Sequence, residues 1–112
     1  MIIQKKITFC ENQTAPFIST THFNPLSDVL SIQVDGNFLS SLVKIEGRSS
    51  NATSWVPLAG INLSDFSVTK KGISKPGLYE FGVIGIREFR VNIEQVDGTV
   101  SVSGQLINAE ET

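Results

Sequence analysis

The sequence predicts an all-β fold, an antiparallel two-sheet β-sandwich that is jelly-roll-like and has about eight strands. Three observations lead to this fold class. Apolar and polar residues alternate over short runs, which is the period of a strand with one buried face. Gly, Pro, Asn, Asp and Ser interrupt these runs at short intervals. No segment shows a sustained helical period.

The expected strands follow one another through short polar links. Leu30, Ile32 and Val34, for example, fall on one face of their segment. Pro57 confines its segment to a sheet edge or a bend, because proline has no N–H to donate to a neighbouring strand. In chain order, the expected strands lie within residues 2–9, 15–23, 29–36, 41–48, 54–60, 61–68, 79–83, 89–93 and 98–106.

The stretch from Tyr79 to Ile93 predicts a β-hairpin. A two-residue loop would set apolar residues opposite charged ones, whereas the three-residue loop 85–87 sets apolar residues opposite each other on one face. A single extended strand would place Arg87 on the core face and would exceed the usual strand length. The predicted pairs are Tyr79 with Ile93, Phe81 with Val91 and Val83 with Phe89.

The next turn is predicted at Asp97-Gly98, a pair typical of type I′ hairpins because both central residues need a positive φ. This turn would place residues 98–106 beside residues 89–93 and complete a three-stranded meander with one apolar face. In it, Val102 would lie opposite Ile93, Gly104 opposite Val91 and Leu106 opposite Phe89. A second sheet, built from the earlier strands, must cover that face.

The length of 112 residues suits one domain, expected over residues 1–107, with a polar tail at residues 108–112 that is expected to fray. The single cysteine, Cys10, excludes an intrachain disulfide. The first residues lack the apolar run of a signal peptide, and no window holds the ~20 apolar residues of a membrane span. We therefore expect cytoplasmic synthesis and no membrane partner.

We predict no catalytic, cofactor-binding or metal-binding residues, and we do not expect an enzyme. His22 is the single histidine, and its surroundings contain no nucleophile or base motif. One His and one Cys are too few ligands for a typical zinc site, and no Gly-rich phosphate loop is present. A net charge of −2 without clustered Lys and Arg argues against nucleic acid as a partner.

Apolar residues in loops are the more informative signal. Phe38 and Leu39 fall in a connection between two strands, and Ile86 falls at the predicted hairpin tip. Leu58 and Ile61 flank a further Gly-containing turn. These loops either fold back over the open ends of the sandwich or contact another chain. Phe38, Leu39 and Ile86 are therefore the candidate interface residues.

Trp55 supports an alternative function. A carbohydrate-binding surface needs aromatic platforms, and Trp55 is the remaining candidate because Tyr79 falls on the predicted core face. On this interpretation the domain binds a carbohydrate or a host receptor through stacking on Trp55. The other interpretation is that Trp55 is partly buried and serves only to pack against the rest of the domain.

Two segments of the C-terminal half resemble small β-rich structural proteins of tailed bacteriophages and prophages. They are "SWVPLAGINLSDFSVT" and "ISKPGLYEFGVIGIREFRVNIEQVDGTVSVSGQL". In that family a W-x-P-L strand precedes a Gly-Tyr strand, a Gly-apolar-Arg turn and an Arg-Val strand. The matching residues here are Trp55, Pro57, Leu58, Gly77, Tyr79, Gly85, Arg87, Arg90 and Val91.

The resemblance implies a virion component, such as a capsid decoration, head fibre, tail or baseplate protein, made in the cytoplasm of a bacterial host. No catalytic residue is carried over with it. The expected partners are other virion proteins or further copies of the chain, in a homo-oligomer. For the alternative function, the partner is a glycan receptor.

Overall fold

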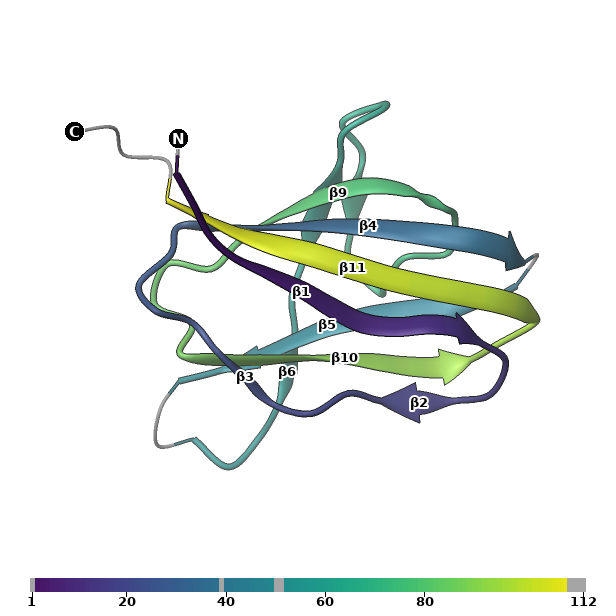
Figure 1. The fold of residues 1–112 in the computed structure, drawn as a ribbon, viewed down its shortest axis with the longest axis horizontal. Coiled ribbons are helices and arrows are strands. Elements are labelled where there is room, and N and C mark those ends of the chain that lie inside the picture. Colours follow the sequence, from purple (N-terminus) through teal and green to yellow (C-terminus); the bar gives the residue numbers. More distant parts are fainter. Residues whose placement is uncertain (1, 39, 50–51, 109–112) are drawn as a thin grey trace.

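The computed structural model describes residues 2–38, 40–49 and 52–108, and these form an all-β sandwich (Figure 1). No helix is present among the described residues, so none of them belongs to a helix long and apolar enough to cross a membrane. The strands are β1 (Ile2–Gln13), β2 (Phe17–Ile18), β3 (His22–Phe23), β4 (Val29–Phe38), β5 (Leu42–Arg48), β6 (Val56–Pro57), β7 (Gly60–Asn62), β8 (Val68–Thr69), β9 (Gly77–Gly82), β10 (Glu88–Gln95) and β11 (Gly98–Asn108).

The strands form two antiparallel sheets. One has the order β1-β11-β4-β9-β7-β8, and the other has the order β2-β10-β5-β6 with β3 also paired to β10. The predicted antiparallel two-sheet fold is therefore confirmed. Eleven strands replace the expected eight or so, because several segments contribute short pieces of two or three residues. The jelly-roll description stays a prediction.

The core lies between the two sheets. The alternating residues of the long strands meet there, and their inward side chains are almost entirely shielded from water. Its largest fully buried side chains are Tyr79, Phe81, Phe89, Leu30, Ile32, Ile45, Ile73, Ile93, Leu106, Val34, Val43 and Val83. The face predicted to be buried in the C-terminal third is the face that the structure buries.

The predicted meander is wrong, because consecutive strands of this region lie in different sheets. β9 pairs with β4 and β7, β10 pairs with β5, and β11 pairs with β1 and β4. Residues 83–87 therefore cross from one sheet to the other instead of closing a hairpin (Figure 1). Of Asp97 and Gly98, only Gly98 has a positive φ (103°), so the predicted type I′ turn does not form.

Periodicity fixed the buried face but not the hydrogen-bonded neighbour. Phe81 pairs with Leu30, and Val91 pairs with Ile45. These partners carry apolar residues in the same phase as the predicted ones, so both arrangements satisfy the alternation. Phe81 and Val91 point into the shared core from opposite sheets, although they do not form a cross-strand pair.

The crossings gather at the two ends of the sandwich. At one end, a hydrogen bond joins the β4–β5 connection to the β10–β11 connection: the Asp97 backbone N–H donates to Ser41 Oγ at 2.9 Å. At the other end, the β3–β4 connection meets the β9–β10 connection, since the Val83 N–H donates to the Asp28 carbonyl at 2.9 Å. The second of these ends carries a cavity.

Candidate interaction surface

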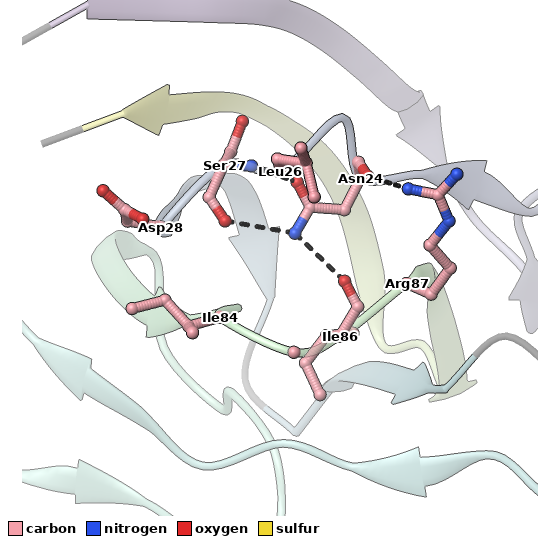
Figure 2. Close-up of a pocket in the computed structure, with 8 residues that line it drawn as sticks. Asn24, Leu26, Ser27, Asp28, Ile84, Ile86 and Arg87 are labelled. Atoms are coloured by element: carbon pink, nitrogen blue, oxygen red, sulfur yellow. Dashed lines mark hydrogen bonds between the residues drawn. The ribbon is translucent and has the colours of Figure 1, made fainter. Parts of the chain in front are cut away.

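The cavity at this end has a volume of about 200 Å³ and opens to solvent between two connections (Figure 2). We call it the end cavity. The apolar side chains of Leu26, Ile84 and Ile86 form much of its lining. Its lining residues are Asn24, Leu26, Ser27, Asp28, Ile84, Gly85, Ile86 and Arg87.

Asn24 holds the two connections together. Its buried side-chain amide donates to the carbonyl oxygens of Val83 and Ile86, both at 3.0 Å, and to that of Ser27 at 3.2 Å. Its Oδ1 accepts from the Ser27 N–H at 2.8 Å. The Arg87 guanidinium donates to the Asn24 carbonyl at 3.2 Å (Figure 2). One polar side chain therefore fixes the shape of the end cavity.

The rim of the end cavity exposes large apolar side chains. Leu26 is 83% exposed and adopts a positive φ of 67°, a conformation that non-glycine residues seldom adopt. Ile84 is 78% exposed on the facing connection. Phe23, next to Asn24, is also exposed. These side chains are held toward water by a hydrogen-bonded scaffold.

Of the predicted interface residues, Ile86 belongs to this end of the molecule. It is half-buried and packs against the core, while its neighbour Ile84 faces solvent. Phe38 ends β4 at the opposite end, where it pairs with Gly98, and its side chain is outside the described structure. Leu39 lies outside the described residues. The three residues therefore do not form one surface, and their interface role stays a prediction.

A second exposed apolar group stands on the β7–β8 hairpin, at the edge of the six-stranded sheet. Phe66 is 76% exposed and has a positive φ of 60°. Its N–H donates to the Asn62 carbonyl at 2.7 Å. Two side-chain caps rigidify the turn, because Asn62 Oδ1 accepts from Ser64 and Asp65 Oδ1 accepts from Ser67. We call residues 62–67 the Phe66 turn.

Sequence reasoning missed Leu26, Ile84 and Phe66. Leu26 and Phe66 did carry a signal, because each is a single large apolar residue within a run of turn-forming residues, "NPLS" and "LSDFS". Ile84 was missed for another reason. It falls between the predicted strand 79–83 and the predicted loop 85–87 and was assigned no role, whereas it lies in a crossing between sheets.

Trp55 lies over the outer face of the five-stranded sheet. The guanidinium carbons of Arg48 and Arg90 lie 4.2 and 4.4 Å from its ring centre, a cation–π geometry. Arg90 also pairs with Glu46 at 2.8 Å, and Arg48 pairs with Glu88 at 3.1 Å. The Trp55 ring is thus half-buried against the chain's own arginines. Its use as a stacking platform for a ligand stays a prediction.

The pairs beneath Trp55 form a ladder of opposite charges across β5 and β10, which we call the charge ladder. Arg48 lies opposite Glu88 and Glu46 lies opposite Arg90 in the register. Lys44 adds a diagonal contact with Glu94 at 2.9 Å. Glu46 is a charged residue, yet it is only 7% exposed. Its carboxylate is satisfied by Arg90 and by the Asn92 amide.

The single histidine and the single cysteine lie in aromatic or apolar surroundings. His22 packs against the rings of Phe9 and Phe89, with centroids 5.0 and 5.7 Å away. Burial, and secondarily Lys5, lowers the pKa of His22 below its ordinary value. Burial raises the pKa of the free thiol of Cys10. Within the described ranges, no three His, Cys, Asp or Glu side chains are grouped to hold a metal ion.

Two solved structures have the same fold as this chain. The chain superposes on the SPBc2 prophage-derived protein YomS with a TM-score of 0.81 and 22% identity, covering 95% of each chain. It superposes on the PBSX exported protein XepA with a TM-score of 0.81 and 23% identity, covering 91% of this chain and 37% of XepA. No curated protein sequence gives a significant match. The family model XepA matches residues 4–106, and the chain therefore belongs to the XepA family.

Proposed function

We propose that this chain is a non-enzymatic, phage-encoded protein that takes part in the virion through protein–protein contacts. The observation that carries the proposal is a set of large exposed apolar side chains: Leu26, Phe66 and Ile84 on connections between strands, and Phe23 at the end of β3. Exposed apolar groups of this kind are typical of surfaces that another protein covers. Burying each side chain is worth roughly 1.5–3 kcal/mol, which favours association.

The relatives support a phage context. YomS is named as a prophage-derived protein, and XepA as an exported protein of PBSX. The resemblance of the C-terminal half to phage structural proteins points the same way. Capsid decoration, head fibre, tail and baseplate are the positions within a particle that this proposal includes.

The test is whether the protein co-purifies with phage particles. Particles of the encoding phage are purified on a density gradient, which separates them from protein released into the culture fluid, and the bound protein is quantified by mass spectrometry. We expect a fixed number of copies in every particle. Wild-type protein confined to the particle-free fractions would contradict the proposal.

Two variants link incorporation to the end cavity. Ile84→Asp is expected to reduce the amount in particles about tenfold while leaving the melting temperature within about 2 °C, because the side chain is exposed. Ile18→Asp is the matched control, since Ile18 is also exposed but lies on β2. Equal incorporation of both variants would show that the end cavity is not the contact.

A further inference from the structure

Another pocket lies between the Phe66 turn and the β8–β9 connection, and three lysines line it. We call it the lysine pocket. Its volume is about 430 Å³, and it opens to solvent. Small-molecule sites have volumes of roughly 300–1,000 Å³, so the lysine pocket is large enough for such a ligand. Its lining residues are Asn62, Asp65, Ser67, Val68, Thr69, Lys70, Lys71, Gly72, Ser74, Lys75 and Tyr79.

The connection that carries the three lysines is fixed to the fold at two points. Ile73 is fully buried, and it exchanges backbone hydrogen bonds with Val43 of β5 at 2.7 and 2.9 Å. The Tyr79 hydroxyl donates to the Lys75 carbonyl at 2.8 Å. The backbone of the lysine pocket is therefore ordered before a ligand binds, which lowers the entropic cost of binding.

The lysine pocket concentrates positive charge on an acidic protein. It holds three of the nine basic residues and one of the eleven acidic residues of the chain. Hydrogen bonds from Ser67, and more weakly the Lys75 ammonium, hold the pKa of Asp65 below its ordinary value, so this acidic residue is charged at neutral pH. The formal charge is therefore +2 in the pocket and −4 over the rest of the chain.

The three lysines lack the partners that other basic residues have. Lys44, Arg48 and Arg90 each form an ion pair in the charge ladder. Within the described part of the chain, none of the lysines of the pocket forms an ion pair. Like charges gathered in this way repel one another and destabilise the folded chain, and a bound anion would remove the repulsion.

A phosphomonoester attached to a sugar matches both the charge and the polar groups of the lysine pocket. The phosphate carries about −1.5 to −2 charges at neutral pH and has three strong acceptor oxygens. Lysine ammonium groups are common ligands of phosphate. The other polar side chains of the pocket can exchange hydrogen bonds with the hydroxyl groups of a sugar. They include Asn62, Ser67, Thr69 and Ser74.

We propose that the lysine pocket binds a phosphorylated sugar, with its phosphate on Lys70, Lys71 and Lys75 and its hydroxyl groups on the polar side chains beside them. The site does not depend on the protein contacts of the proposed function. It lies at the start of β9, which contributes Tyr79, whereas the end cavity lies just after the end of β9. Each can therefore be altered without changing the other.

The test is a ¹H–¹⁵N NMR titration of the full chain with glucose 1-phosphate. We expect saturable shifts of the backbone amides of residues 67–75, and none with unphosphorylated glucose. Inorganic phosphate is expected to bind about fivefold or more weakly, because it lacks the hydrogen bonds of the sugar. Absence of saturation with glucose 1-phosphate, or equal affinity for inorganic phosphate, would overturn the proposal.

Two matched double variants test the lysines. Lys71→Gln combined with Lys75→Gln removes two positive charges from the lysine pocket, and Lys5→Gln combined with Lys6→Gln removes two from β1. We expect the first to weaken binding of glucose 1-phosphate about fivefold or more and the second less than about twofold. Equal losses would show that overall charge attracts the ligand and would overturn the site. Circular dichroism melts verify that both variants are folded.

A lipid headgroup is the other source of a phosphomonoester. Phosphatidylcholine vesicles that contain phosphatidic acid present this group on a surface. We expect glucose 1-phosphate to bind and the chain to stay in solution when these vesicles are sedimented. Co-sedimentation that is lost in the Lys71→Gln, Lys75→Gln chain, without binding of glucose 1-phosphate, would overturn the sugar phosphate as the ligand and assign the pocket to a lipid.

Discussion

At the scale of single residues, Asn24 determines the most distinctive part of the surface. The two hydrogens of its amide are shared among three carbonyl oxygens, and its Oδ1 accepts a hydrogen bond from one N–H. No apolar residue of similar size replaces these hydrogen bonds. Its side chain is buried, so losing it leaves carbonyl groups unpaired without access to water. The exposed position of Leu26 depends on this arrangement.

We expect Asn24→Ala to lower the free energy of unfolding by about 2–4 kcal/mol, because several buried polar groups lose their partner together. Urea denaturation followed by fluorescence measures the change. Asn37→Ala, at an exposed position of β4, is the control with an expected change below about 0.5 kcal/mol. Similar losses for both variants would contradict the role assigned to Asn24.

His22 makes stability depend on pH. Its pKa in the folded chain is below the ordinary value of 6.5, so the unfolded chain takes up a proton first as the pH falls. The resulting stabilisation is present above pH 6.5 and is lost as the pH falls toward the lowered pKa. We expect the melting temperature to drop between pH 7.5 and 5. In His22→Phe, which keeps an aromatic ring against Phe9, that drop should be smaller; an unchanged drop would exclude His22 as its source.

At the scale of elements, the sequence determined which residues are buried better than which strands are neighbours. The alternation of β9, β10 and β11 predicts their inward faces correctly, because period-two burial is a local property. Whether a link of three to five residues turns back or crosses to the other sheet depends on competing partners. Here β5 pairs with β10 and β4 pairs with β11, and both partners are as apolar as the predicted ones. The local alternation of each strand therefore does not determine which strand lies beside it.

The candidate site was less predictable than the fold. Ile86 was found by its place in a connection, but the exposed neighbour is Ile84, because the crossing turns the chain differently from a hairpin. Asn24 joins residues 59 and 62 positions away in the chain. A hydrogen-bond hub of this kind exists only in the folded arrangement.

The pairing of β4 with β11 requires a glycine. Gly36 has a φ of +139°, and a Cβ there would lie 2.0 Å from the Thr99 carbonyl oxygen. We expect Gly36→Ala to cost about 3 kcal/mol or to prevent folding, through strain and overlap with backbone. Gly82→Ala is the control, because its Cβ would meet nothing within 4 Å. Thermal melts compare the two, and equal melting temperatures would contradict this account.

Trp55 holds the segment that leads to β6 against the arginines of β5 and β10. We expect Trp55→Ala to lower the free energy of unfolding by about 1–3 kcal/mol, from the lost cation–π contacts and the exposure of the charge ladder. Trp55→Phe should recover part of the loss. Denaturant titration measures both, and a fully stable Trp55→Ala would show that the ring contributes nothing to the sheet.

At the scale of the whole molecule, most sheet neighbours are far apart in the chain. The first and eleventh strands pair along much of their length, and the Asn12 N–H bonds to Ser101, 89 positions away. Strands that are far apart in the chain must close a long loop before they can pair, and this requirement makes folding slow. We expect refolding over roughly milliseconds to seconds in stopped-flow experiments. A microsecond phase carrying most of the signal would contradict this.

The long edge strand β1 is also protected against joining another sheet. Its register shifts at three places, and Lys5 and Lys6 lie along it. Irregular, charged edges discourage the open-ended stacking that leads to aggregates. Association through β1 is therefore disfavoured, in contrast to association through exposed side chains of the connections.

Pairing of Ile2 with Asn108 brings the beginning of β1 and the finish of β11 together, at the corner where Ile107 bonds to Asp28. Figure 1 shows the beginning of β1 and the end of β11 on this side. Cargo joined directly to the beginning of β1 or to the end of β11 would consequently lie near the Leu26 rim. A fluorescent reporter attached there would block access to the rim sterically. A reporter inserted in an exposed link such as residues 52–54 would leave the rim accessible.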